Sequence, residues 1–189
     1  EARNKYAVGY EVLFFFVGRF AVIKNILFIA DVLGALKKRG LKFKMIFVGD
    51  GPDRKKLEEK ISANGVNEET TFLGFVTDKN VLYSVYSAAD LFLFPSQYDT
   101  LSMVQIEAAS RYLPCAFVKD SVTSYTVTGG VNGYVFPADV EGYSDGIYSA
   151  VSDREKLEEI GKNAHRDLYV TRDEVIQKLL NYYDELLNK

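Results

Sequence analysis

Two cations near the start of the chain stand in a setting that suits phosphate binding. Arg19 follows the apolar run 12–17 and Gly18, and Lys24 comes five residues later, at the start of a segment with helical spacing. A helix N-terminus carries partial positive charge and free N–H groups, which add to the two side-chain charges. The pattern fits a diphosphate site and an exposed basic loop equally well.

Two carboxylates form a second candidate group. Asp99 follows the apolar run 91–94, and Glu107 comes eight residues later, about one turn inside an expected helix. Carboxylates accept paired hydrogen bonds from sugar hydroxyls, and N–H groups at a helix start suit a phosphate or sugar oxygen. These N–H groups belong to Thr100, Leu101, Ser102 and Met103. The alternative makes Asp99 a helix N-cap and Glu107 a solvated residue, although the apolar neighbours of Glu107 favour a buried carboxylate with partners.

Two glycine-containing loops complete the candidate site. Gly49 and Gly51 resemble the opening of a dinucleotide-binding fingerprint, but Arg54 stands where its third glycine belongs, so a turn shaped by close packing is the stronger alternative. The other loop, Gly74, Phe75 and Val76, offers backbone groups beside an aromatic ring, which would receive a nucleobase edge. Packing of Phe75 into the core is the alternative left open.

The elements that must position these residues alternate in type along the chain. A continuous apolar run predicts a buried strand at 12–17, and the alternation that follows predicts further strands at 43–48, 71–73, 91–94, 115–118 and 134–136. Helical spacing predicts helices at 25–38, 52–64, 78–88, 102–112 and 121–128, followed by two or three more within 141–189. Such alternation predicts a Rossmann-like, doubly wound parallel sheet of about six strands, with helices on both faces and a helical C-terminal tail. Ligands bind such sheets outside the carboxyl ends of the strands, where all the candidate residues lie.

Composition narrows the class of protein. The 189 residues suit one domain, and 48% hydrophobic with 26% charged residues is typical of a globular chain. With 23 basic against 26 acidic residues and no basic stripe, nucleic acid is excluded as the main partner. The single Cys115 cannot form an intrachain disulfide, and no zinc-ligand spacing occurs, so we expect a reducing compartment, the cytoplasm.

The chain divides into three expected parts. Residues 1–11 are charged and read as a linker remnant, 12–137 as the α/β core and 138–189 as C-terminal helices. The chain begins at Glu1 rather than Met, and residues 1–10 lack the apolar core of a signal peptide, so the chain reads as an excised piece that forms one domain.

Five motifs, taken in order, resemble one known family. They are Phe-Val-Gly-Arg-Phe with Lys24 following, Phe-Val-Gly-Asp-Gly-Pro, Phe-Leu-Gly-Phe-Val, Ala-Asp-Leu-Phe-Leu-Phe-Pro-Ser, and the carboxylate pair leading to Ile-Glu-Ala-Ala. Together they resemble the C-terminal, nucleotide-sugar-binding domain of the GT-B-fold retaining glycosyltransferases of family GT4, and the resemblance covers residues 14–137. The fold would then be one half of a GT-B enzyme.

The resemblance implies roles for individual residues. Arg19 and Lys24 would bind the donor diphosphate and stabilise the leaving group. Glu107 would hydrogen-bond the ribose hydroxyls, and Asp99, one methylene shorter than the family's glutamate, would contact the transferred sugar. These four are the expected catalytic residues. The other expected donor-binding residues are Gly18, Gly49, Gly51, Gly74, Phe75, Val76, Thr100, Leu101, Ser102 and Met103.

A second departure from the family lies further along the chain. Ser121, Val122 and Tyr125 stand where the family often has two glycines and a glutamate. This departure is consistent with three possibilities: that the chain belongs to a subgroup of the family, that it uses a different donor, or that its site is weakened.

The resemblance also implies an activity and its partners. The chain would supply donor binding for transfer of a sugar from a nucleotide sugar, with UDP favoured as the nucleotide, to an acceptor hydroxyl. No metal or other cofactor is expected, because the two cations replace one. The acceptor would bind an N-terminal domain absent from this chain, so the chain alone would be inactive. Location at the inner face of the membrane, through peripheral association of that half, is left open.

Two alternatives to a glycosyltransferase remain: a nucleotide-sugar epimerase, and a non-catalytic nucleotide-sugar-binding or scaffold domain.

Overall fold

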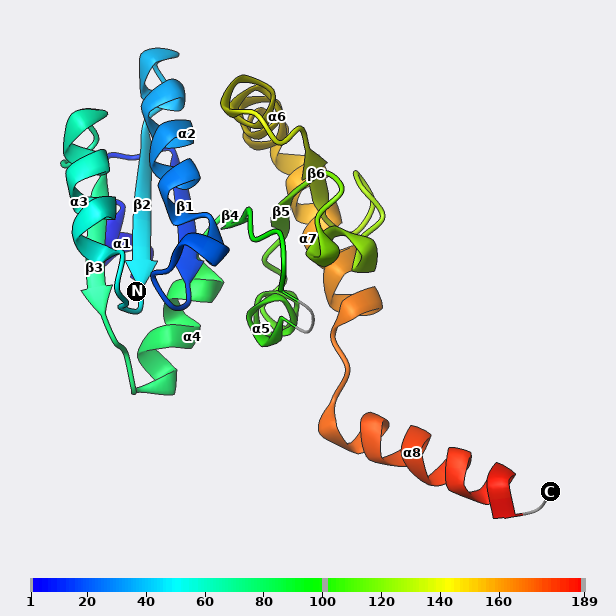
Figure 1. Cartoon of the computed structure of the whole chain (residues 1–189). Coiled ribbons are helices and arrows are strands. Elements are labelled where there is room, and N and C mark those ends of the chain that lie inside the picture. Colours follow the sequence, from blue (N-terminus) through cyan, green and yellow to red (C-terminus); the bar gives the residue numbers. More distant parts are fainter. Residues whose placement is uncertain (1, 100–101, 188–189) are drawn as a thin grey trace.

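The protein is built around one parallel sheet (Figure 1). The structure, a computed structural model, describes residues 2–99 and 102–187. Within these residues six strands lie in the order β3-β2-β1-β4-β5-β6, and every pair is parallel. The strands are β1 (Val12–Val17), β2 (Phe43–Val48), β3 (Thr70–Gly74), β4 (Leu91–Phe94), β5 (Cys115–Val118) and β6 (Tyr134–Phe136). This arrangement confirms the predicted doubly wound fold.

Helices cover both faces of the sheet. They are α1 (Ala2–Tyr6), α2 (Ile26–Lys38), α3 (Arg54–Ala63), α4 (Lys79–Ala88), α5 (Met103–Ser110), α6 (Val140–Ser152), α7 (Arg154–Leu168) and α8 (Arg172–Leu187), with short 3-10 helices at Val22–Lys24 and Val122–Thr126. The buried residues of α2, α3 and α6 join one core cluster, and those of α4 and α5 join another on the opposite face.

The strand order reverses direction at β1. This strand pairs with β2 on one side and β4 on the other, so that Phe14 lies between Met45 and Leu91. The crossover after β1 runs toward β2, whereas the crossover after β4 runs toward β5, so the loops after these two neighbouring strands diverge at the carboxyl edge of the sheet. Such a reversal point is where an open α/β sheet binds its ligands.

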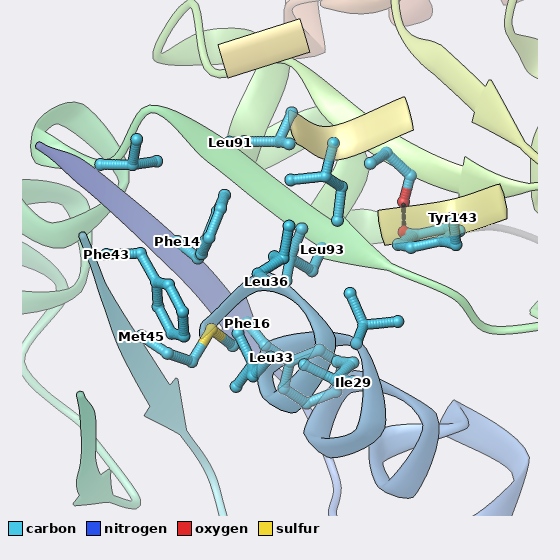
Figure 2. Packing of buried hydrophobic residues seen from close by; sticks show 14 of the residues in the cluster. Phe14, Phe16, Ile29, Leu33, Leu36, Phe43, Met45, Leu91, Leu93 and Tyr143 are labelled. Carbon is cyan, nitrogen blue, oxygen red and sulfur yellow. Dashed lines mark hydrogen bonds between the residues drawn. The ribbon is translucent and has the colours of Figure 1, made fainter. Parts of the chain in front are cut away.

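The strand β1 is buried on both faces because its side chains alternate between the two clusters. Phe14 and Phe16 pack with α2, whereas Leu13 and Phe15 pack on the opposite face. In Figure 2, Phe14 and Phe16 lie among side chains of α2, β2 and β4. In the same view the Tyr143 hydroxyl donates a hydrogen bond of 2.7 Å to the Ala116 carbonyl, which ties α6 to β5.

The segment expected to be a linker remnant contains α1. Arg3 of this helix pairs with Asp90 at 2.8 Å, and α1 contacts α4. The same carboxylate accepts hydrogen bonds from Arg154 and from the Leu13 N–H. Residues far apart in sequence therefore hold this segment against the domain.

The last helix extends away from the sheet (Figure 1). None of the residues of α8 is buried, although 175, 176, 179, 180, 183 and 187 are apolar. Across the described residues, no helix combines the length and the apolar character needed to span a bilayer.

Candidate functional site

Three loops at the carboxyl edge of the sheet are joined to one another by main-chain hydrogen bonds. The bonds run from Gly18 N–H to Val48 O (3.0 Å), from Phe20 N–H to Asp50 O (2.9 Å) and from Gly49 N–H to Gly74 O (2.7 Å). The loops after β1, β2 and β3 therefore form a continuous backbone frame whose position does not depend on exposed side chains.

The glycines of this frame are required by close backbone contact. Gly49 has φ +121°, and a Cβ there would lie 2.0 Å from the Gly18 carbonyl oxygen. A Cβ on Gly51 would lie 2.4 Å from the Phe20 carbonyl oxygen. The close-packing interpretation of these glycines is thus supported, and it is the same packing that brings the β1 and β2 loops together beside an open cavity.

That cavity has a volume of about 480 Å³ and is mostly apolar. Its lining consists of Val17, Gly18, Arg19, Val48, Gly49, Asp50, Phe75, Val76 and Leu82. Phe75 lies at the edge of the cavity and is 81% exposed, so the alternative that placed its ring in the core is wrong. Five residues singled out from the sequence therefore meet at one cavity, with a cation and an aromatic ring on the same rim.

Lys24 is the last residue of the 3-10 helix 22–24, and Asn25 separates it from α2. The Asp53 carboxylate accepts a 2.9 Å hydrogen bond from the Val22 N–H, which anchors the start of this turn to the β2 loop. The Lys56 ammonium, together with that N–H, lowers the pKa of Asp53 below its ordinary value. Lys24 is half-buried and forms an ion pair with Asp99, whereas Arg19 is exposed at the cavity.

Asp99 does not cap α5, because the capping position belongs to Ser102. The Ser102 side chain makes no capping hydrogen bond, and its Oγ is buried without a partner among the described residues. Asp99 and Ser102 belong to the lining of a second cavity of about 200 Å³. Met103, the first residue of α5, is exposed. Thr100 and Leu101 lie outside the described residues.

Glu107 lies in the second turn of α5 and is half-buried. Its Oε2 accepts a hydrogen bond of 2.9 Å from the hydroxyl of Tyr86, a fully buried residue of α4. Burial, with the neighbouring Glu107 charge, raises the pKa of Tyr86 well above its ordinary value, so the phenol remains a donor. The structure therefore supports the expectation that the Glu107 carboxylate has a hydrogen-bond partner, rather than the alternative in which it is solvated.

Reasoning from the sequence did not find Tyr86. Its neighbours Val85 and Leu82 are apolar, and the residue looks like a core position. The one available signal was the hydroxyl itself, because a buried tyrosine normally needs a hydrogen-bond partner.

The candidate residues thus form three groups at one edge of the sheet: the cavity with Arg19 and Phe75, the Lys24–Asp99 pair, and Glu107 held by Tyr86. Over residues 2–99 and 102–187, no group of three or more His, Cys, Asp or Glu side chains is placed to hold a metal ion. The arrangement offers positive charge, an exposed aromatic ring and carboxylate acceptors, a combination that suits a nucleotide with phosphates.

The sequence of this chain is similar to those of known proteins. The family model described as glycosyl transferases group 1 matches residues 1–167. Among curated proteins, the chain is 27% identical to alpha-D-kanosaminyltransferase of Streptomyces kanamyceticus over 87% of this chain and 42% of that protein. It is 32% identical to alpha-monoglucosyldiacylglycerol synthase of Acholeplasma laidlawii, over 67% of this chain and 31% of that protein. The chain spans less than half the length of these relatives.

Solved structures share the fold. Anabaena HepE in complex with UDP superposes with a TM-score of 0.82 at 22% identity, over 97% of this chain and 51% of that one. The C-terminal domain of a glycosyl transferase group 1 family protein from Francisella tularensis superposes with a TM-score of 0.74 at 20% identity, over 83% of this chain and 84% of that one. The family model matches most of the chain, which has the fold and the site geometry described above. This chain therefore belongs to the glycosyl transferases group 1 family.

Proposed function

We propose that the chain is the donor-binding half of a retaining glycosyltransferase of the GT4 type, which transfers a sugar from a nucleoside diphosphate sugar to an acceptor hydroxyl. The observation that carries this proposal is the 480 Å³ cavity at the reversal point of the sheet, with Arg19 and the exposed Phe75 on its rim. An apolar cavity with an aromatic rim suits a base, and the adjoining cations suit its phosphates.

In this proposal the two cations act on the leaving group. As the glycosidic bond to the diphosphate breaks, negative charge grows on the phosphate oxygens, and the fixed charges of Arg19 and Lys24 stabilise it. The first turn of α5, at Ser102 and Met103, adds N–H groups and the positive end of a helix dipole. The proposal includes no metal or other cofactor.

The carboxylates recognise hydroxyl groups. Glu107 accepts hydrogen bonds from the ribose, and Asp99 contacts the transferred sugar once the phosphates have engaged Lys24. Gly74, Phe75 and Val76 receive the base. Thr100 and Leu101 keep the role expected of them from the sequence, facing the sugar and phosphates.

UDP is the proposed nucleotide. Support comes from the HepE structures, which contain UDP or UDP-glucose. A relative from Mycobacterium tuberculosis, 25% identical over 67% of this chain, is named as GDP-mannose-dependent, so the nucleotide must be tested directly. Calorimetric titration of the chain with UDP, GDP and ADP decides it, and binding of none of the three would contradict the proposal.

Substitution of the two cations tests the phosphate assignment. Arg19→Ala and Lys24→Ala should each weaken UDP binding at least about tenfold and leave uridine binding nearly unchanged, because only the phosphates feel the lost charge. Lys55→Ala is the matched control, since the Lys55 side chain is 88% exposed on α3. Equal losses for UDP and uridine would contradict the assignment.

The acceptor site is proposed to lie on a second, N-terminal domain. The short coverage of the relatives supports this, as does the Francisella structure, which is named as a C-terminal domain and has a similar extent. Holding the acceptor in line and excluding water would be tasks of the paired domains. We therefore expect the chain alone to bind UDP and to transfer no sugar from UDP-glucose, and robust transfer by this chain would contradict the division. The proposed location is the cytoplasm, with association at the membrane depending on the second domain.

A further inference from the structure

Tyr86 is placed to control the carboxylate that the proposed function assigns to the ribose. Its hydroxyl lies 2.9 Å from Glu107 Oε2 and 3.5 Å from the Val104 carbonyl oxygen. A phenol has one proton to donate, and the carboxylate is both the nearer and the charged acceptor. The hydrogen bond therefore runs from Tyr86 to Glu107 and links α4 to α5.

The Tyr86 ring is rigidly held. It packs edge-on against Phe15 of β1 with ring centroids 4.9 Å apart, and it stacks against Phe92 of β4 at 6.0 Å. These two strands flank the reversal point of the sheet. A ring that is fully buried between them cannot change rotamer easily, so its hydroxyl is a fixed point in the frame of the sheet.

The same helix face connects Tyr86 to the cavity. Leu82 lies four residues earlier on α4 and lines the 480 Å³ cavity, and residues four apart share a face of a helix. Glu107 Oε2 is engaged by Tyr86, whereas Oε1 has no hydrogen-bond donor among residues 2–99 and 102–187. One carboxylate oxygen is thus anchored and the other remains available as an acceptor.

We propose that Tyr86 is a positioning residue for nucleotide recognition: its hydroxyl holds one oxygen of Glu107 so that the other accepts the ribose hydroxyls. This inference rests on the proposed function, in which Glu107 binds the ribose. A carboxylate fixed before the ligand arrives loses less side-chain freedom on binding, which raises affinity. Without the phenol, Glu107 can turn toward solvent.

The test compares nucleotides with and without ribose hydroxyls. UDP and 2′,3′-dideoxy-UDP are titrated calorimetrically into the wild-type chain and into the Tyr86→Phe, Glu107→Gln and doubly substituted chains. Tyr86→Phe should weaken UDP binding about tenfold and change dideoxy-UDP binding less than about twofold, because only the ribose contact is affected. In the Glu107→Gln background, the further loss from Tyr86→Phe should fall below about twofold, since the two residues act through one contact.

A matched control separates positioning from folding. Tyr143 is also fully buried, and its hydroxyl donates to the Ala116 carbonyl (Figure 2). Neither residue lines the cavity. Tyr143→Phe removes the same atom and should leave both nucleotide affinities unchanged, with thermal unfolding reporting any loss of stability in either variant.

Each other outcome points to a different error. Equal losses of UDP and dideoxy-UDP affinity in Tyr86→Phe would show a purely structural role and overturn the proposal. A Glu107→Gln chain that binds UDP as tightly as wild type would overturn the ribose assignment itself, and the role of Tyr86 with it. A Glu107→Gln loss without any Tyr86→Phe loss would overturn the role of Tyr86 alone.

Discussion

Lys24 and Asp99 form an ion pair between the loops that follow β1 and β4, the two strands at the reversal point of the sheet. Each side chain is 23% exposed, so the pair is accessible to a ligand but only partly screened by water. The Ser96 hydroxyl donates to the Ile23 carbonyl at 3.2 Å and holds the two loops together nearby. The cation proposed for the diphosphate thus already has a partner within the chain.

This ion pair predicts the direction in which a substitution of Asp99 changes UDP affinity. Asp99→Asn removes the carboxylate that competes with phosphate for Lys24, so UDP should bind about twofold to fivefold more tightly. The additional affinity for UDP-glucose over UDP should fall at the same time, because Asp99 is also the proposed sugar contact. Calorimetry with both ligands measures the two effects. Asp139→Asn, at the N-cap of α6, changes the net charge equally and should alter neither. Weaker UDP binding in Asp99→Asn would rule out competition within the pair.

The backbone contact at Gly49 predicts a large loss of stability. Gly49→Ala places a Cβ against the Gly18 carbonyl at a positive φ and should lower the free energy of unfolding by about 3 kcal/mol or more. Gly40→Ala is the control, because its φ is +80° but no atom lies within 4 Å of its Cβ. That variant should lose only about 1 kcal/mol. Urea denaturation of both variants separates steric overlap from backbone strain, and equal losses would contradict the close-contact argument.

Asp53 predicts a dependence of stability on pH. Its pKa is lowered in the folded chain, chiefly by the Lys56 ammonium, so the unfolded chain binds the proton more readily. The stabilisation is therefore present above about pH 5 and is lost as the pH falls below about 4, through the ordinary and then the folded pKa of an aspartate. Asp53→Asn should be less stable than wild type at pH 7, and the difference should shrink toward pH 3. A difference that stays constant over this range in denaturant titrations would contradict the assignment.

The exposed helix α8 predicts a neutral truncation. A chain ending at Val170 should keep its melting temperature within about 2 °C and its UDP affinity unchanged, because no residue of α8 is buried. Removal of the exposed apolar side chains of α8 should reduce the binding of a hydrophobic dye to the chain. Differential scanning fluorimetry and dye fluorescence measure these effects, and a markedly lower melting temperature would show that α8 packs on the domain.

Much of the fold could be predicted because local pattern decides it. Continuous apolar runs define β1, β4 and β5 with the expected bounds, because these strands are buried on both faces of the sheet. The bounds of β2 and β6 are also as expected, although Lys44 interrupts β2 and two of the three residues of β6 are half-buried. By contrast β3 is half-buried, and its observed bounds, 70–74, exceed the expected 71–73 by one residue at each end. The helix α1 was not expected, because an ion pair between Arg3 and the distant Asp90 holds it in place.

The site was predictable to a lesser degree. Residues that directly follow strands, such as Arg19 and Phe75, were found because a parallel sheet brings all strand ends to one edge. The partners of Lys24 and Glu107 were not found. Both partnerships join separate elements, and nothing in the local spacing of Asp99 or Tyr86 encodes which side chain lies opposite.

The backbone frame of the three loops separates recognition from architecture. The hydrogen bonds among 18–20, 48–50 and 74 use only main-chain groups, while Arg19 and Phe75 project from the frame as exposed side chains. In the proposed donor site, a substitution at either position would therefore change the contact with base or phosphate without breaking the hydrogen bonds between the loops. Under the proposed function, donor preference would therefore change through these side chains alone, while the main-chain hydrogen bonds that hold the loops remain intact.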